Sequence, residues 1–150
     1  MLYDRGVNYE FHMGAALAEA RAGADRGDRA HGSAATLDDV LVARAHDQVR
    51  TTGDPTAHAV LNVVREAARR LGQERLSGVT VFATHEPCMM CLGALLECDV
   101  DNLVYALSDP GTGAVGRSQA AGYGRRLHVV SGIMQAEAAD LRRAPAGRGR

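Results

Sequence analysis

Residues 54–60, DPTAHAV, and residues 86–91, EPCMMC, decide the fold and the chemistry of this chain. The first stretch supplies His58, and the second supplies Cys88 and Cys91, which are separated by two residues and preceded by Pro87. One imidazole and two thiolates form a ligand set for Zn²⁺. Three protein ligands leave a fourth position open, which is typical of a catalytic rather than a structural zinc ion. The sequence therefore predicts a Zn²⁺ site at His58, Cys88 and Cys91.

Other interpretations of a Cys-x-x-Cys pair fit this chain less well. Half of a zinc ribbon would need a second such pair, which the sequence lacks. A redox dithiol needs no histidine upstream of it. The chain has three cysteines, an odd number with two at ligand spacing, and this pattern favours metal binding in a reducing compartment over disulfide formation.

Length and composition are typical of an ordinary globular domain. The chain has 150 residues, of which 46% are hydrophobic, and a formal net charge of -1, so one domain over residues 1–150 is expected. The chain has no general excess of basic residues, so its overall charge does not favour binding to nucleic acid. No apolar run resembles a signal peptide or a membrane span, so we expect no membrane contact and a cytoplasmic location. Residues 144–150 are expected to form a disordered tail.

The hydrophobic periodicity predicts a hairpin followed by strands that alternate with helices. The strands are expected at residues 33–37, 40–45, 79–84, 102–107 and 126–131. The helices are expected at residues 9–24, 55–71, 87–97 and 133–143, with polar or glycine-rich loops at 47–53 and 108–124. Asp54 is expected to cap the second helix, with Pro55 at its first position. This order of elements predicts an α/β domain with a mixed sheet.

Both ligand motifs are expected to lie on the first turn of a helix. Cys88 and Cys91 are three residues apart, so their side chains would point the same way. The positive end of the helix dipole favours thiolate over thiol. His58 would reach the same point if the two helices pack side by side.

The chain resembles the cytidine, guanine and tRNA-adenosine deaminase family, with the closest likeness to bacterial tRNA adenosine deaminases and their purine-base relatives. The stretches that match are DPTAHA at 54–59, REAARRLG at 65–72, EPCMMC at 86–91 and SDP at 108–110. The resemblance covers roughly residues 11–141. It implies a three-layer α/β/α cytidine deaminase-like fold with a five-stranded mixed sheet, a bound Zn²⁺ and a homodimer or related oligomer. It also implies a nucleobase, nucleoside or related heterocycle as the ligand.

The chain departs from this family at the position that matters most for catalysis. Zinc deaminases carry the signature H-x-E, in which the Glu is the general acid and base. Here Val60 occupies the position of that Glu. Because a valine side chain cannot transfer protons, we expect hydrolytic deamination to be absent or reduced.

Other departures concern the substrate pocket. Asp47 stands where the family usually has an Asn that contacts the substrate, and His85 replaces an apolar residue. Residues 30–33, AHGS, replace a segment whose backbone lines the pocket, so the resemblance implies Ser33, together with Asp109, as candidate substrate contacts. Residues 117–126 are shorter than the matching loop of the tRNA deaminases, which argues against tRNA as the substrate.

Three interpretations remain open. The chain is an inactive member, like the inactive subunit of the eukaryotic tRNA adenosine deaminase, and binds RNA or an active partner. Alternatively it is an active hydrolase of the C–N bonds of cyclic amidines, in which Asp47 or His85 has taken over the acid–base role. In the third interpretation, Val60 is a knock-out substitution in an ordinary deaminase.

Overall fold

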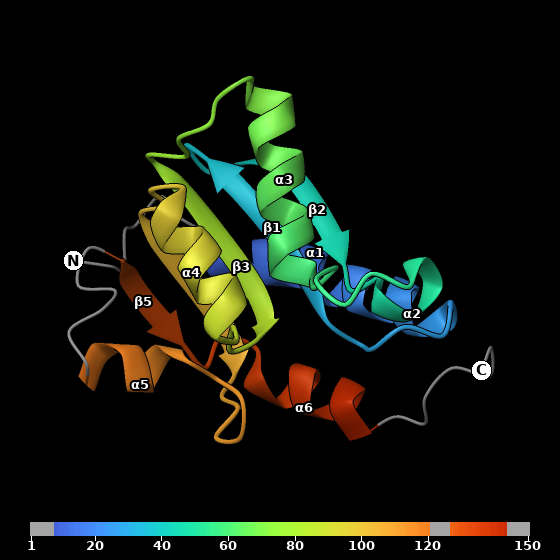
Figure 1. Ribbon diagram of the computed structural model, residues 1–150. Helices are drawn as coiled ribbons and strands as arrows, with labels where there is room; N and C mark the ends of the chain where they lie inside the picture. The colour runs from blue at the N-terminus through green and yellow to red at the C-terminus, as the bar shows by residue number, and fades with distance from the viewer. Residues whose placement is uncertain (1–7, 121–126, 144–150) are drawn as a thin grey trace.

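The computed structural model describes residues 8–120 and 127–143 and contains the predicted mixed sheet (Figure 1). The five strands are β1 (Gly32–Leu37), β2 (Val40–His46), β3 (Val79–His85), β4 (Asn102–Leu107) and β5 (His128–Ser131). Their order in the sheet is β2-β1-β3-β4-β5. Strand β1 is antiparallel to β2 and β3, whereas β3, β4 and β5 are parallel. The predicted tail at 144–150 and part of the loop at 108–124 lie outside the described residues.

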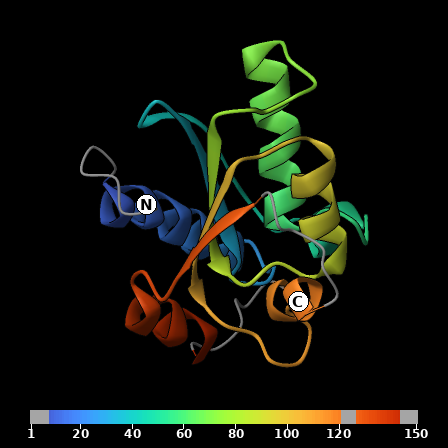
Figure 2. The same ribbon diagram turned by 90° about the vertical axis from the view of Figure 1, so that its left-hand side faces the viewer.

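Helices cover both faces of the sheet, as the resemblance implied (Figure 2). Helices α1 (Tyr9–Asp25) and α6 (Gln135–Arg143) lie on one face, and α3 (Ala59–Leu71) and α4 (Met89–Glu97) lie on the other. Each face has its own core of buried apolar side chains. Since β3 is covered on both sides, it is an almost continuous run of buried residues. Within the described ranges, no helix has both the length and the apolar character that crossing a bilayer requires.

The β1–β2 hairpin closes where the sequence predicted it. Leu37 pairs with Val40, and Asp38 and Asp39 form the two-residue turn between them, with φ angles of 52° and 62°. Two consecutive residues with positive φ suit the right-handed twist of the flanking strands.

The predicted starts of the two ligand-bearing helices are wrong by a few residues. Helix α3 begins at Ala59 rather than at Pro55, because Asp54 caps a separate turn: its carboxylate accepts hydrogen bonds from the backbone N–H and the hydroxyl of Thr56, at 2.8 and 2.7 Å. Helix α4 begins at Met89 rather than at Pro87. As a result, His58 and Cys88 are both N-cap residues with extended backbones, at ψ angles of 152° and 176°.

Two segments expected as loops contain short helices, and one helix begins later than expected. Helix α2 (Val49–Thr52) lies within 47–53, and α5 (Val115–Ala120) lies within 108–124. Helix α6 begins at Gln135 rather than at Ile133, after Gly132 with a φ angle of 84°.

Candidate metal centre and cavity

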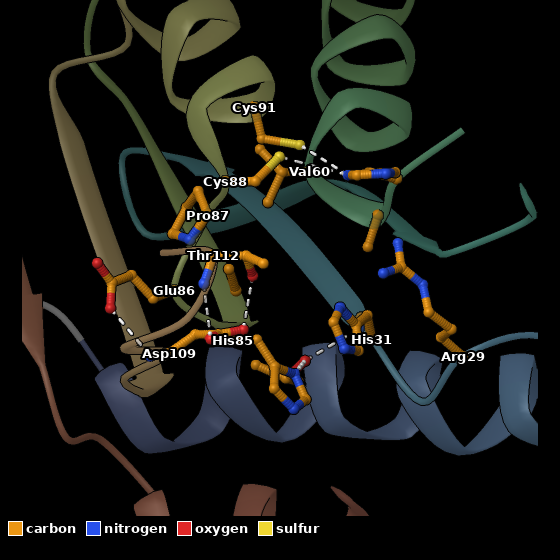
Figure 3. A pocket seen from close by; sticks show the side chains of 15 residues that line it. Arg29, His31, Val60, His85, Glu86, Pro87, Cys88, Cys91, Asp109 and Thr112 are labelled. Atoms are coloured by element: carbon orange, nitrogen blue, oxygen red, sulfur yellow. Dashed lines mark hydrogen bonds between the residues drawn. The ribbon is translucent and has the colours of Figure 1, made fainter. Parts of the chain in front are cut away.

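The fold brings the three predicted metal ligands together where α3 and α4 begin (Figure 3). The Nδ1 atom of His58 lies 3.5 Å from Cys88 Sγ and 3.6 Å from Cys91 Sγ. His58 and Cys88 precede the first turns of their helices, and Cys91 lies in the first turn of α4. The imidazole and the two sulfurs therefore face one point between the two helix starts.

These separations fit a zinc ion. Zn–N and Zn–S bonds of about 2.1 and 2.3 Å at a tetrahedral angle place nitrogen and sulfur about 3.6 Å apart. The two measured separations agree with this value. Among the described residues these three form the only group of His, Cys, Asp or Glu side chains that approach closely enough to share an ion. The site therefore fits Zn²⁺ with three protein ligands and one further position for water or substrate.

The ligand geometry also favours one thiolate before any metal binds. The Cys91 thiol, donating to Cys88 Sγ, and the nearby His58 ring lower the pKa of Cys88 to about 4. The same hydrogen bond, together with burial, raises the pKa of Cys91. The contact between the two cysteines thus favours the thiolate form of Cys88, which is the form that binds metal.

A cavity of about 200 Å³ opens beside the metal ligands. It lies at the edge of the sheet where β3 and β4 end and β1 begins. Gly32, the first residue of β1, packs so closely on α1 that a Cβ atom there would lie 1.9 Å from the backbone oxygen of Ala16. Of the residues predicted for the site, His58, Val60, His85, Cys88, Cys91 and Asp109 line this cavity.

Val60 contributes only hydrocarbon to the cavity wall. It is the second residue of α3, is 5% exposed and lies beside the metal ligands (Figure 3). It also packs into the apolar core between α3, α4 and the sheet. The cavity wall is therefore apolar at position 60, where the resembling deaminases carry a carboxylate.

The two carboxylates that line the cavity, Glu86 and Asp109, hold its far wall together. Glu86 accepts hydrogen bonds from the backbone N–H groups of Asp109 and Val115, at 2.9 and 3.1 Å. Asp109 accepts from the backbone of Gly111 and from the backbone and hydroxyl of Thr112. These bonds, chiefly those from Thr112, lower the pKa of Asp109. Both carboxylates thus accept hydrogen bonds from the segment that follows β4 and stabilise its conformation.

Asp47 lies outside the cavity lining, and Arg29 lines the cavity in its place. Asp47 is 0% exposed, and its Oδ2 accepts hydrogen bonds from Nη2 and Nε of Arg29, at 2.6 and 3.1 Å. Its Oδ1 accepts from the backbone N–H of Val49 at the start of α2. Sequence reasoning missed Arg29. The available signal was the acidic residue itself, because a buried carboxylate needs a cation beside it.

His85 lines the cavity and stacks on His31, with ring centroids 3.9 Å apart and 12° between the ring planes. The hydroxyl of Thr84 accepts from the backbone N–H of Gly32, at 3.0 Å, and lies 2.9 Å from His85 Nδ1. A hydroxyl can donate one hydrogen bond and accept two, so this contact fixes the orientation of the His85 ring. The Nε2 atom of His85 is buried and has no hydrogen-bond partner among the described residues.

Both stacked imidazoles are neutral at pH 7. Burial, with a smaller effect of neighbouring positive charges that include Arg142, lowers the pKa of His85 to about 4. Burial, helped by His85 and Arg29, lowers the pKa of His31 to about 3. Sequence reasoning did not anticipate the stack, because β1 and β3 join these residues only in the folded sheet.

Ser33 does not reach the cavity. It is 0% exposed, and its hydroxyl donates to the backbone oxygen of Phe82 at 2.6 Å. The substrate-binding roles assigned by resemblance to Ser33 and Asp47 stay predictions that the cavity lining does not support.

Comparison with known proteins agrees with this geometry. Residues 7–107 match the family described as the cytidine and deoxycytidylate deaminase zinc-binding region. The chain is 36% identical to a tRNA-specific adenosine deaminase of Agrobacterium fabrum, over 87% of this chain and 89% of that protein. It is 41% identical to a tRNA(Ile)-lysidine synthase of Deinococcus radiodurans over 87% of this chain, but it spans only 23% of that protein's length.

A solved structure from a study of A-to-I editing by tRNA:A34 deaminases has the same fold. It superimposes with a TM-score of 0.81 and 36% identity, covering 87% of this chain and 98% of that one. The described fold, the ligand set and the family match agree with one another. The chain therefore belongs to the cytidine and deoxycytidylate deaminase family of zinc-binding proteins.

Proposed function

We propose that this chain binds a nucleobase-type heterocycle at a zinc centre and deaminates it far more slowly than a chain with Glu at position 60 would. The observation that carries this proposal is Val60, a buried hydrocarbon on the cavity wall beside an intact ligand set. The centre has the three metal ligands of the family, but it has no carboxylate at position 60 to transfer protons.

The proton chemistry supports this conclusion. A zinc ion held by His58, Cys88 and Cys91 would supply a water acidic enough to act as a nucleophile near neutral pH. Deamination then needs a group that takes a proton from the attacking water and delivers one to the leaving amine. Glu86 and Asp109 are engaged by backbone N–H groups, and Asp47 is engaged by Arg29. Loss of a positioned acid–base group typically lowers a rate about 10²- to 10⁴-fold.

The names of the relatives indicate which ligands to test first. They are tRNA-specific adenosine deaminases, so adenine within a tRNA and free adenosine head the list, followed by guanine, cytosine and their nucleosides. A chain that binds such a base with little turnover would act as a binding subunit for RNA or for an active deaminase.

The test combines three measurements on the zinc-loaded chain: zinc per chain, ligand affinity by titration calorimetry, and ammonia release. We expect about one zinc ion per chain, measurable binding of at least one base or nucleoside, and slow ammonia release. A His58→Ala variant, which lacks one ligand, is the control for metal-dependent binding. Fast turnover by the unaltered chain would contradict the proposal.

A second candidate is an active enzyme that uses His85, because this residue lines the cavity and its Nε2 atom has no partner in the described structure. If His85 transfers protons, a His85→Gln variant should lose turnover while its zinc content and affinity for ligand stay unchanged. Asp47 is a weaker candidate, since both of its oxygens already accept hydrogen bonds.

Assembly and location also belong to the proposal. The homodimer implied by the resemblance is supported by Met89 and Met90 of α4, which are 75% and 37% exposed. Sedimentation of the purified chain tests this directly. The free cysteines and the metal-binding pair support a reducing, cytoplasmic location.

A further inference from the structure

Arg29 presents an unused hydrogen-bonding edge to the cavity. Its Nε and Nη2 atoms both donate to one oxygen of Asp47. Within residues 8–120 and 127–143, the structure gives this guanidinium no other hydrogen-bond or ion-pair partner. The adjoining edge, formed by Nη1 and the second N–H of Nη2, therefore has no partner among the described residues. The Arg29 side chain is 43% exposed, whereas that of Asp47 is 0% exposed.

The free edge suits an oxyanion. Two parallel N–H groups of a guanidinium match two oxygens of a carboxylate or a phosphate. Asp47 is fixed by burial and by its second bond to the start of α2, so it holds the guanidinium in place before a ligand arrives. Such preorganisation reduces the entropy lost on binding.

The charges around the cavity favour the same ligand. Val60 places hydrocarbon where a Glu would repel an anion. The lining carboxylates Glu86 and Asp109 lie on the opposite side of the cavity from Arg29, and backbone N–H groups bind both (Figure 3). His31 and His85, between the two sides, are uncharged at neutral pH.

We propose that Arg29, positioned by Asp47, binds an oxyanion carried by the ligand, either a phosphate or a ring carboxylate. The cavity would then select negatively charged heterocycles over their neutral counterparts. The inference rests on the proposed function in one respect: the ring of the ligand is taken to lie at the zinc centre. It explains why an acidic residue occupies position 47, since Asp47 serves Arg29 and not the ligand.

The test compares matched ligand pairs by calorimetry on the zinc-loaded full chain. Adenosine and cytidine 5′-monophosphates are compared with their nucleosides, and orotate is compared with uracil, so the arms separate phosphate from carboxylate. At least one anionic member should bind about 10- to 100-fold more tightly than its neutral partner, as expected for hydrogen bonds between charged groups.

Variants test whether Arg29 causes that preference. Arg29→Gln alone would leave Asp47 buried without a cation and could unfold the chain, so the double variant Arg29→Gln/Asp47→Asn is the main probe. It should lose the preference and keep the affinity for the neutral ligand. The control is Arg44→Gln, which removes an ion pair outside the cavity whose arginine is 44% exposed and leaves Glu19 in contact with His46. This control should keep the preference.

The outcomes separate the two proposals. If neutral ligands bind as tightly as anionic ones, or if the preference survives in the double variant, the Arg29 proposal is overturned and the proposed function stands. If no ligand of either kind binds the zinc-loaded chain, both proposals are wrong.

Discussion

Replacing Val60 by Glu should raise the rate of hydrolytic deamination. Val60 is the second residue of α3, lies beside Cys88 (Figure 3) and lines the same cavity as His58. A carboxylate at this position would share the cavity with the fourth position of the metal. It would thus be placed to take a proton from the attacking water and pass one to the leaving amine.

The size of the gain and its cost in stability follow from the environment of Val60. A positioned acid–base group is worth about 10²- to 10⁴-fold in rate, or about 2.7–5.4 kcal/mol of activation free energy. Val60 is only 5% exposed, so losing its burial should lower the free energy of unfolding by about 1.5–3 kcal/mol. The variant should therefore have a lower free energy of unfolding and a much higher rate of deamination.

The assay is ammonia release at saturating zinc, with folding checked by circular dichroism. Val60→Gln is the matched control, because glutamine is polar and has the size of glutamate but cannot take up a proton at neutral pH. The ratio of the rates of the Glu and Gln variants isolates the acid–base contribution. If that ratio is near one while both variants are folded and bind zinc, the reasoning is refuted.

Three further predictions concern stability. Glu86→Ala should lower the free energy of unfolding by about 2–4 kcal/mol, because two backbone N–H groups lose their acceptor; an unchanged melting temperature would contradict this role. In the unfolded chain His31 and His85 bind protons below about pH 6.5, whereas in the folded chain their pKa values are about 3 and 4. The free energy of unfolding should thus fall as the pH drops from about 6.5 towards 4, by at most about 1.4 kcal/mol per pH unit for each histidine. The test is urea unfolding at a series of pH values. If the free energy of unfolding depends on pH in the same way in the wild type and in His85→Gln, His85 makes no such contribution. Removal of zinc with a chelator should lower the melting temperature, and zinc, but not magnesium, should restore it.

The sheet could be predicted from the sequence because local residue patterns mark its strands and the turn of its hairpin. The β-branched run of β3, buried on both sides, and the Asp38-Asp39 turn need no knowledge of distant contacts. The ligand set could also be predicted, since the spacing of Cys88 and Cys91 is a local feature.

The start of α3 shows why local signals sometimes fail. A cap residue followed by proline is compatible with a helix start and equally with an isolated turn. In this chain Asp54 closes a turn through Thr56, and the helix begins only after His58. The Asp-Pro pattern alone does not distinguish these two outcomes.

The role of Arg29 could not be read from spacing for a related reason. Arg29 and Asp47 are 18 residues apart and meet because β1 and β2 pair, with Gly32 opposite His46. A carboxylate needs a cation beside it only when it is buried, and the sequence does not show that Asp47 is buried. The fold buries Asp47 and places Arg29 beside it.

The most direct test of the central claim is a zinc-edge X-ray absorption spectrum of the purified chain. Three protein ligands at an open site predict one nitrogen donor at about 2.0–2.1 Å, two sulfurs at about 2.3 Å, and one light-atom donor that changes when a ligand binds. Four protein donors, or a zinc ion without sulfur neighbours, would contradict it.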